Sequence, residues 1–363
     1  MTGSRLFPSR RFQIQAALLG AVLILAVLLI WQVASNIQRQ SLHFGLGFLS
    51  RTAGFSILQT LIPFNETSTY GRAFVVGLLN TLAVAVCGVV ASTFLGFAVG
   101  LGRLAPNRLL RWLSTGYVEL IRNLPLLLIL FFLYFGLLRQ LPPPRQSLAF
   151  AGIYLNNRGL FLPSADLSPL SAGILAIAIF GGIGVAVGGG RKRLFAGLAC
   201  VCALAALWLT APAVSWPEVK GLGVAGGVKL IPEFVALAAA LSIYTASYIA
   251  EIVRAGIQAV PLGQRDAAEA LGLSPWQTTR LVIIPQAMRL ILPPLTSQYL
   301  NLTKNSSLAV AIAYPDLVSV FAGTTLAQTG QAVEIIAITM AVYLTLSLGT
   351  AALLNWRRTE HFS

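Results

Sequence analysis

Charged side chains inside long apolar segments are the residues of this sequence that could do chemistry. Glu119 and Arg122 lie three positions apart in one such segment, and Glu251 and Arg254 repeat that spacing near the end of another. This spacing places both side chains of a pair on one face of a helix, where opposite charges can meet. Because ionisable groups at bilayer depth are costly, they are functional candidates. Two interpretations stay open: the pairs hold the helices together, or they form a gate at the cytoplasmic mouth of a helix bundle.

A polar run at positions 303–307 interrupts another apolar segment. Lys304 lies about 20 Å along its predicted helix, at about 1.5 Å per residue, so its ammonium group does not easily reach the inner surface. Polar groups at that depth must face protein or a water-filled cavity. We therefore expect either a polar path that Lys304 lines or a buried ion pair between Lys304 and Glu119 or Glu251. The candidate path residues are Asn80, Thr81, Gln298, Asn301, Lys304, Asn305, Ser306 and Ser307.

Catalytic and metal-binding patterns are missing from the sequence. The two histidines, His43 and His361, lie far apart in the chain, and the three cysteines lie in apolar stretches where they behave as small hydrophobes. The glycine-rich stretch at 181–190 lacks the Lys-Ser or Lys-Thr that would make it a phosphate loop. The sequence therefore predicts no catalytic residue, no metal ion and no cofactor bound by this chain.

The composition places these charges in a membrane protein. Hydrophobic residues make up 56% of the 363 positions and charged residues 10%, with a mean hydropathy of +0.80. A soluble domain could not bury that much apolar surface. Because a spanning helix needs about 20 apolar residues, the sequence predicts an all-α integral membrane protein with about eight transmembrane helices. They lie near 13–34, 73–101, 116–138, 168–189, 194–213, 231–252, 290–313 and 333–355.

The distribution of basic residues predicts the orientation. The net charge is +14, and Lys and Arg are more frequent in the segments that face the cytoplasm if the N-terminus lies there. Both termini are then cytoplasmic, and the partner implied by the charge is membrane lipid, not nucleic acid. The apolar run at 13–34 is longer than a signal-peptide core and is interpreted as a retained signal anchor, with cleavage as the alternative.

The longest predicted cytoplasmic loop, 255–287, carries local helix signals. Residues 266–271 are strong helix formers and precede Gly272. Ser274 can cap a second helix that has proline at its first position, and Pro285 is expected to close it. The loop is therefore predicted to be a compact knob of two short helices.

This loop resembles the cytoplasmic signature of the permeases of ATP-binding-cassette (ABC) importers. The signature is Glu-Ala-Ala, three residues, Gly, nine residues, and then aliphatic, any residue, aliphatic and Pro. The chain follows this spacing, with Asp in place of the first Glu. In that family the loop docks into a groove of the ATPase subunit, which implies a coupling role for 262–285. The matching or adjacent coupling residues are Asp266, Ala267, Ala268, Glu269, Gly272, Trp276 and Pro285.

The flanking segments resemble permeases for polar amino acids. The resemblance covers roughly 72–138 and 231–356, the five-helix core of type I importer permeases. The additions outside that core resemble the general L-amino-acid importers. The expected organisation is a signal-anchor helix and periplasmic segment at 1–71, core at 72–141, an inserted loop and helix pair at 142–229, core at 230–356, and a cytoplasmic tail at 357–363.

The resemblance implies a permease of the bacterial inner membrane that moves amino acids into the cytoplasm by alternating access. Its implied partners are ATPase subunits that bind ATP and Mg, a second homologous permease subunit, and a periplasmic amino-acid-binding protein. The alternative is an ion-gradient-driven transporter of small polar solutes. Such transporters often contain repeats in matched halves, and the halves of this sequence do not match.

Overall fold

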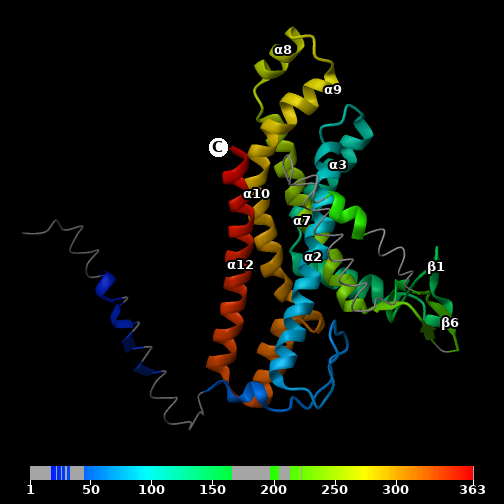
Figure 1. Cartoon of the computed structure of the whole chain (residues 1–363), viewed down its shortest axis with the longest axis vertical. Coiled ribbons are helices and arrows are strands. Elements are labelled where there is room, and N and C mark those ends of the chain that lie inside the picture. The colour runs from blue at the N-terminus through cyan, green and yellow to red at the C-terminus, as the bar shows by residue number, and fades with distance from the viewer. Residues whose placement is uncertain are drawn as a thin grey trace, which may run out of the picture.

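The computed structural model describes residues 45–165 and 213–362 except 222, together with short helical pieces within 18–32 and 197–203. Of the three helices predicted at 13–34, 168–189 and 194–213, the second lies wholly outside these described residues and the other two are described only in part. Four long helices run side by side and form the body of the protein (Figure 1). They are α2 (Tyr70–Gly102), α7 (Pro232–Gln258), α10 (Ile284–Asn305) and α12 (Ala332–Phe362).

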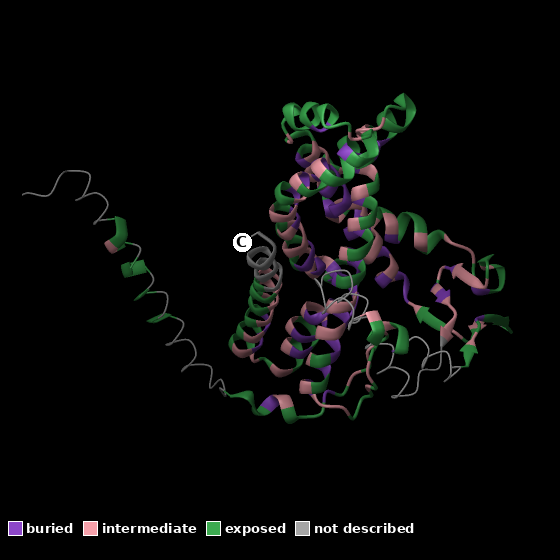
Figure 2. Ribbon diagram, turned by 45° about the horizontal axis from the view of Figure 1, so that its top comes forward, coloured by how far each residue is buried: buried purple, intermediate pink, exposed green. Residues whose placement is uncertain are grey.

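Small residues let α2 and α7 pack closely. A Cβ atom added to Gly96 would lie 2.6 Å from Cβ of Ile249, and one added to Gly100 would lie 2.9 Å from the carbonyl oxygen of Ala250. Without a hydrophobic driving force between helices in lipid, such close backbone approach supplies the dispersion contacts that hold a membrane bundle together. Burial is concentrated along this seam, whereas the α8 and α9 end is mostly exposed (Figure 2).

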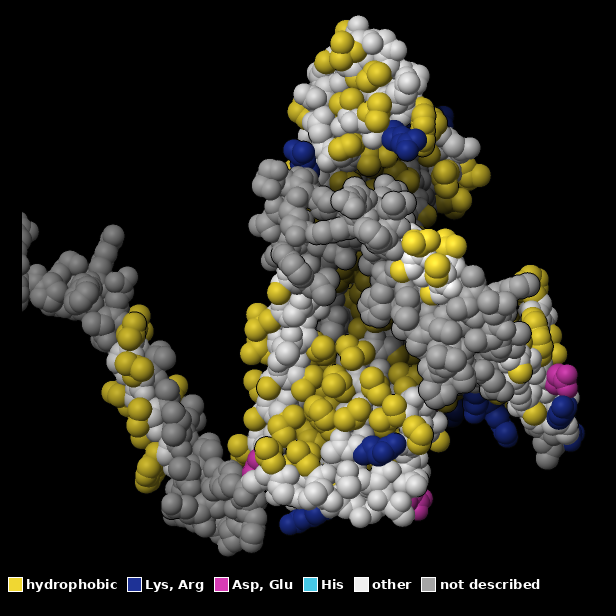
Figure 3. Space-filling view, viewed as in Figure 1, with side chains coloured by type: hydrophobic (Ala, Val, Ile, Leu, Met, Phe, Trp, Pro, Cys, Tyr) yellow, Lys and Arg dark blue, Asp and Glu magenta, His cyan; other side chains and the backbone are white. Residues whose placement is uncertain are grey.

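Three described helices are long and apolar enough to cross a membrane: Tyr70–Gly102, Pro232–Gln258 and Ala332–Ala352. They match the segments predicted at 73–101, 231–252 and 333–355. Hydrophobic side chains cover the middle of the bundle, and Lys and Arg side chains lie toward its ends (Figure 3). This distribution is the one that a lipid bilayer requires.

The single helix predicted at 116–138 is wrong, because the chain bends there by 105°. α3 (Arg108–Arg122) ends before Pro125, and α4 (Leu126–Phe131) starts after it and continues into η2 (Phe132–Leu137) and η3 (Leu138–Gln140). Proline has no backbone N–H and forces the residue before it out of the helical region. The two halves together are one possible fourth span or a re-entrant segment.

The predicted end of a short helix at Pro285 is also wrong. α9 (Pro275–Gln277), η5 (Thr278–Ile283), α10 and η6 (Ser306–Ile312) follow one another without a break. η5 is a π-helical stretch. Its wider turn accommodates Pro285, whose missing N–H would leave a gap in a regular α-helix. The second helix of the knob is therefore the start of the long helix α10.

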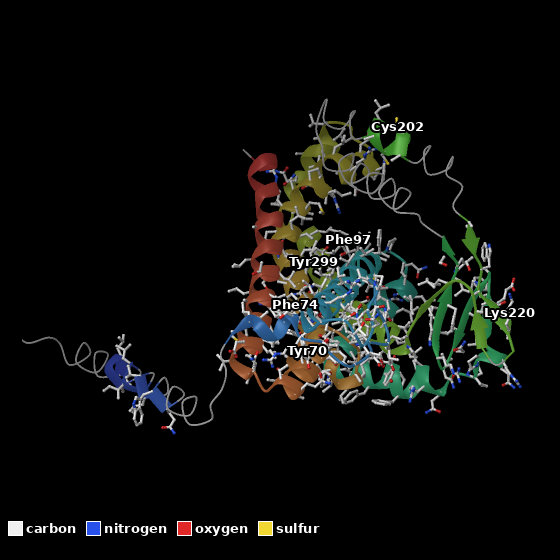
Figure 4. The ribbon with its side chains drawn as sticks, turned by 60° about the horizontal axis from the view of Figure 1, so that its bottom comes forward. Tyr70, Phe74, Phe97, Cys202, Lys220 and Tyr299 are labelled. Atoms are coloured by element: carbon white, nitrogen blue, oxygen red, sulfur yellow. The ribbon has the colours of Figure 1, made fainter. Side chains whose placement is uncertain are left out.

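The segment after η6 contains elements that the sequence pattern did not predict. The chain reverses at Ala313, which has a left-handed conformation with φ of 57°. It then forms η7 (Val318–Thr325) and α11 (Leu326–Thr329) before α12. At the same end, η1 (Leu46–Ser50) packs Phe48 against Phe321, with ring centroids 6.1 Å apart. Tyr70 and Phe74 of α2 lie beside this aromatic cluster (Figure 4).

Short β-strands lie within 148–165 and 214–230, in the segment 142–229 for which a loop and a helix pair were predicted. After η4 (Pro144–Gln146), one antiparallel sheet has the order β1-β2-β3-β8, and two further two-stranded sheets pair β4 with β5 and β6 with β7. The sheet returns the chain from η3 to the start of α7. The strands are β1 (Leu148–Phe150), β2 (Ile153–Asn156), β3 (Gly159–Leu162), β4 (Ser164–Ala165), β5 (Val214–Ser215), β6 (Glu218–Lys220), β7 (Gly223–Ala225) and β8 (Val228–Leu230).

Candidate functional site

The knob predicted between 262 and 285 projects from one end of the bundle (Figure 1). α8 (Leu262–Ala270) ends before Gly272, which has φ of +73°. Ser274 and Gln277 form a reciprocal capping box, in which the Ser274 backbone N–H donates to Oε1 of Gln277 at 2.9 Å. These local bonds satisfy polar groups of the turn between α8 and α9.

The outer surface of the knob carries large apolar side chains. The exposed fraction is 76% for Leu262, 81% for Leu271 and 68% for Trp276. The predicted coupling residues Asp266, Ala267, Glu269, Gly272 and Pro285 are also exposed, whereas Ala268 is buried. Exposed apolar groups rimmed by charges are typical of a surface that another protein covers. The geometry therefore suits the docking role that the signature implies.

An ionic cluster lies beneath the knob. Glu251 on α7 pairs with Arg254 one turn further along and with Arg103, the residue that follows α2. Arg254 also donates a hydrogen bond to Gln258. The Arg103 side chain is only 13% exposed and that of Glu251 27%. The cluster thus joins the C-terminal ends of α2 and α7, ahead of the knob in the chain.

Arg103 was missed by the sequence analysis as a candidate. It stands 148 positions from Glu251, and its only signal was its place just after an apolar segment. No spacing rule connects residues that far apart. The pairing of Glu251 with Arg254, which are close in sequence, is present as predicted.

The other predicted pair does not form. Glu119 and Arg122 are both exposed, and no ion pair joins them in the described structure. Instead the Arg122 guanidinium lies 5.0 Å from the centroid of the Tyr248 ring of α7. A nearby aromatic face is a competing partner for a cation, and it takes Arg122 away from the carboxylate. Any gate at this position would involve Arg122 with Tyr248.

Two candidate path residues serve the structure of the bundle. The Asn80 side chain is fully buried and donates hydrogen bonds of 2.8 Å to the carbonyl oxygens of Gln59 and Pro315. The Thr81 hydroxyl is also buried and accepts a bond of 3.0 Å from the Leu317 backbone N–H. These contacts fix the turn after η6 against α2.

The exposed polar residues of α10 lie on one side of the helix. Asn301 and Lys304 are exposed and Gln298 and Asn305 are half-buried. Ser306 points inward and donates to the carbonyl oxygen of Thr303. On another face, Tyr299 bonds Thr93 of α2 at 2.7 Å and lies near Phe97 (Figure 4). α10 therefore has a packed face toward α2 and a polar face away from it.

The Lys304 side chain lines a groove between the end of α10 and α12. The groove has a volume of about 440 Å³. Lys304 makes no ion pair with any carboxylate in the described ranges, so the pairing predicted with Glu119 or Glu251 is absent. The other lining residues are mostly apolar or hydroxylic: Ser307, Val318, Thr339, Met340, Tyr343, Leu344 and Ser347. One cation in such a lining is suited to an anionic group of a small ligand.

Asp316 is a further polar residue that the sequence analysis missed. It is fully buried in the turn after η6, and its Oδ1 accepts a 2.8 Å bond from the Ser319 backbone N–H. Its Oδ2 has no hydrogen-bond partner among the described residues. Within the same residues, no cluster of three or more His, Cys, Asp or Glu side chains could hold a metal ion.

Comparison with known proteins agrees with the geometry. Residues 88–358 match the family described as the binding-protein-dependent transport system inner membrane component. The chain is 50% identical to the putative amino-acid ABC transporter permease protein YhdX of Escherichia coli over 95% of this chain and 91% of that protein. It is 47% identical to the general L-amino acid transport system permease protein AapQ of Rhizobium johnstonii, over 92% and 88%.

A solved structure shares the fold. It is described as an amino acid ABC transporter with histidines and is 24% identical in sequence, with a TM-score of 0.51. The similarity covers 80% of this chain and 95% of that one. The arrangement of the helices is thus similar to that in a known amino acid ABC transporter.

Proposed function

Because this chain belongs to the family of inner membrane components of binding-protein-dependent transport systems and is an ABC importer permease, we propose that it moves amino acids into the cytoplasm by alternating access. The amino-acid cargo is supported by two relatives that match nearly the whole chain and are described as amino-acid permeases. We further propose a periplasmic amino-acid-binding protein and a second, homologous permease subunit as partners in the bacterial inner membrane.

The observation that carries this proposal is the knob formed by α8 and α9. Its turn is held by a capping box, it exposes Leu271 and Trp276, and it continues directly into α10. A force applied to the knob by a separate ATPase subunit would therefore act on a helix that lines the bundle. ATP and Mg would bind on that subunit.

The knob also supports the proposed orientation. The C-terminal half of α12 runs toward the end of the bundle that bears α8 (Figure 1). If the knob meets a cytoplasmic ATPase, the C-terminus lies in the cytoplasm. The aromatic cluster of η1 and η7 then lies at the periplasmic end, where a binding protein would dock.

The cargo path follows the polar face of α10. Gln298, Asn301, Lys304, Asn305 and Ser307 lead along that helix to the groove beside α12. Every amino acid carries a carboxylate, so one lysine can hold that shared group while the apolar and hydroxylic walls accept different side chains. Glu251 and its two arginines would form the inner gate, because they tie α2 to α7 just before the knob.

Uptake by proteoliposomes tests the function. The chain would be purified with its neighbouring subunits, reconstituted, and supplied with binding protein and labelled amino acids outside and ATP inside. We expect uptake that needs ATP and is indifferent to proton and sodium ionophores. Uptake without the ATPase subunits that collapses with an ionophore would show the ion-driven alternative instead.

A paired variant tests the role of the knob. Leu271→Ser with Trp276→Ser removes two of the three exposed apolar groups and leaves the capping box in place. We expect the ATPase subunits to dissociate during purification, while the thermal midpoint of the permease itself is unchanged. Phe150→Ser is the matched control, because Phe150 is 82% exposed and lies in the β-sheet region.

A further inference from the structure

The first turns of α3 carry a basic and aromatic surface that the proposed transport role does not use. α3 lies toward the end of the bundle that bears α8 (Figure 1). Its N-cap, Asn107, accepts hydrogen bonds of 2.9 and 3.2 Å from the backbone N–H groups of Leu109 and Leu110. Ser114 and Val118 are the buried residues of this helix. Arg108, Leu109, Arg111 and Trp112, in its first turns, are all exposed.

An open groove of about 660 Å³ runs along this surface. It is lined by Arg108, Leu109, Arg111, Trp112 and Thr115. Positions 108, 111 and 115 share one face of the helix, and positions 109 and 112 form the adjacent face. The exposed fraction is 72% for Trp112 and 65% for Leu109. The groove thus has a cationic side and an apolar side.

The cationic side lacks a counter-charge within the described structure. Neither Arg108 nor Arg111 forms an ion pair with a described carboxylate. Arg111 donates a long hydrogen bond of 3.5 Å to the carbonyl oxygen of Ala105. The first turn of α3 contains no acidic residue. The positive end of the helix dipole adds to the same field, so the groove attracts an anion.

We propose that this groove binds an anionic phospholipid of the leaflet nearest α8. The phosphate headgroup lies between the guanidinium groups of Arg108 and Arg111, the Trp112 ring lies at headgroup depth, and the acyl chain covers Leu109. Basic residues next to a membrane surface select anionic lipid headgroups, and tryptophan favours the interface. A lipid fills both sides of the groove at once, whereas a small soluble anion leaves Leu109 and Trp112 exposed to water.

Quenching of Trp112 fluorescence tests this assignment in the assembled transporter. The transporter would be placed in nanodiscs that contain a small fraction of brominated phosphatidylglycerol or brominated phosphatidylcholine. The difference between the wild type and Trp112→Phe isolates the signal of this tryptophan. We expect several-fold stronger quenching by the anionic lipid, and a smaller difference as salt rises because screening weakens phosphate contacts.

Two charge variants locate the site. Arg108→Gln with Arg111→Gln should equalise quenching by the two lipids. Arg51→Gln with Arg158→Gln removes the same charge from exposed positions outside α3 and should keep the preference. Equal quenching in the wild type, or a preference that survives the α3 variant, would overturn the proposal. Absence of quenching by either lipid would also overturn it, because another protein surface would then cover the groove.

Discussion

The Glu-x-x-Arg pairs of α3 and α7 have the same spacing and opposite outcomes. On α7, Glu251 and Arg254 meet and gain Arg103 from the end of α2. On α3, Arg122 stacks on Tyr248 and leaves Glu119 exposed. The spacing makes an ion pair possible, but the neighbouring helix decides whether it forms. Arg103 at the end of α2 makes the Glu251–Arg254 pair part of a contact between helices. On α3, the Tyr248 ring is the partner of Arg122 in place of Glu119.

Replacing the glutamate of each pair should show the largest difference in stability, because only Glu251 has ion-pair partners in the described structure. Glu251→Gln leaves the poorly exposed Arg103 guanidinium without a counter-charge. Breaking such a pair costs about 3 kcal/mol. The thermal midpoint of the purified permease should therefore fall by several degrees. Glu119→Gln is the matched control, with an expected change within about 0.5 kcal/mol. Equal shifts in the two variants would show that the contact between helices has no special role.

Lys304 differs from the arginines of both pairs, because it has neither a carboxylate nor an aromatic partner among the described residues and is instead proposed to bind the cargo. Lys304→Met should lower amino-acid uptake about tenfold, equivalent to about 1.4 kcal/mol of lost interaction with the substrate. The thermal midpoint should not fall, because no ion pair is broken. Normal uptake by this variant would remove Lys304 from the path. Lys220→Met is the control, since Lys220 pairs with Glu218 at an exposed hairpin, 3.1 Å apart.

The two arginines of the α7 cluster should differ in their effects. Arg103→Gln removes the bond between helices and should cost about 1–2 kcal/mol of stability. Arg254→Gln removes a partner on the same helix, and its side chain is 29% exposed. Its cost should be about 0.5 kcal/mol. Chemical denaturation of the two variants checks this order, and the reverse order would place the stabilising contact within α7 alone.

The α3 contact should give the smallest effect. Tyr248→Leu removes the ring beneath Arg122, which contributes about 0.5–1 kcal/mol at an exposed site. Tyr248→Phe keeps the ring and loses only the 3.0 Å contact between the hydroxyl groups of Tyr244 and Tyr248. The Phe variant should unfold at nearly the wild-type temperature. If Tyr248→Phe lost more stability than Tyr248→Leu, the hydroxyl contact would be the stabilising interaction.

Local signals predicted the knob and part of its boundaries. Gly272, Ser274 and Pro275 act within a few positions, and the structure shows the left-handed turn and the capping box that they predict. The end at Pro285 was wrong because a π-helical turn absorbs a proline that normally breaks a helix. The hydropathy and capping patterns of the sequence carry no signal for that π-helical stretch.

The bend at Pro125 and the elements after η6 show the limit of hydropathy. An apolar run indicates that a segment avoids water, but it does not indicate whether the segment is one straight helix or two helices joined by a bend. Asn80 and Thr81 were candidates for a cargo path, and their hydrogen bonds to the turn at 315–317 became visible only when α2 and that turn came together. Asp316 was not a sequence candidate either, because its burial depends on the same packing of the turn against α2.

The sequence by itself determined the lipid environment, the positions of three spans, the knob and the family resemblance. Each of these rests on composition or on residues within a few turns of one another. The tertiary structure alone decided which charges meet, which polar residues are structural, and which face of α10 is open. Contacts such as Arg103 with Glu251 join positions 148 residues apart, and only the packing of α2 on α7 brings them within reach.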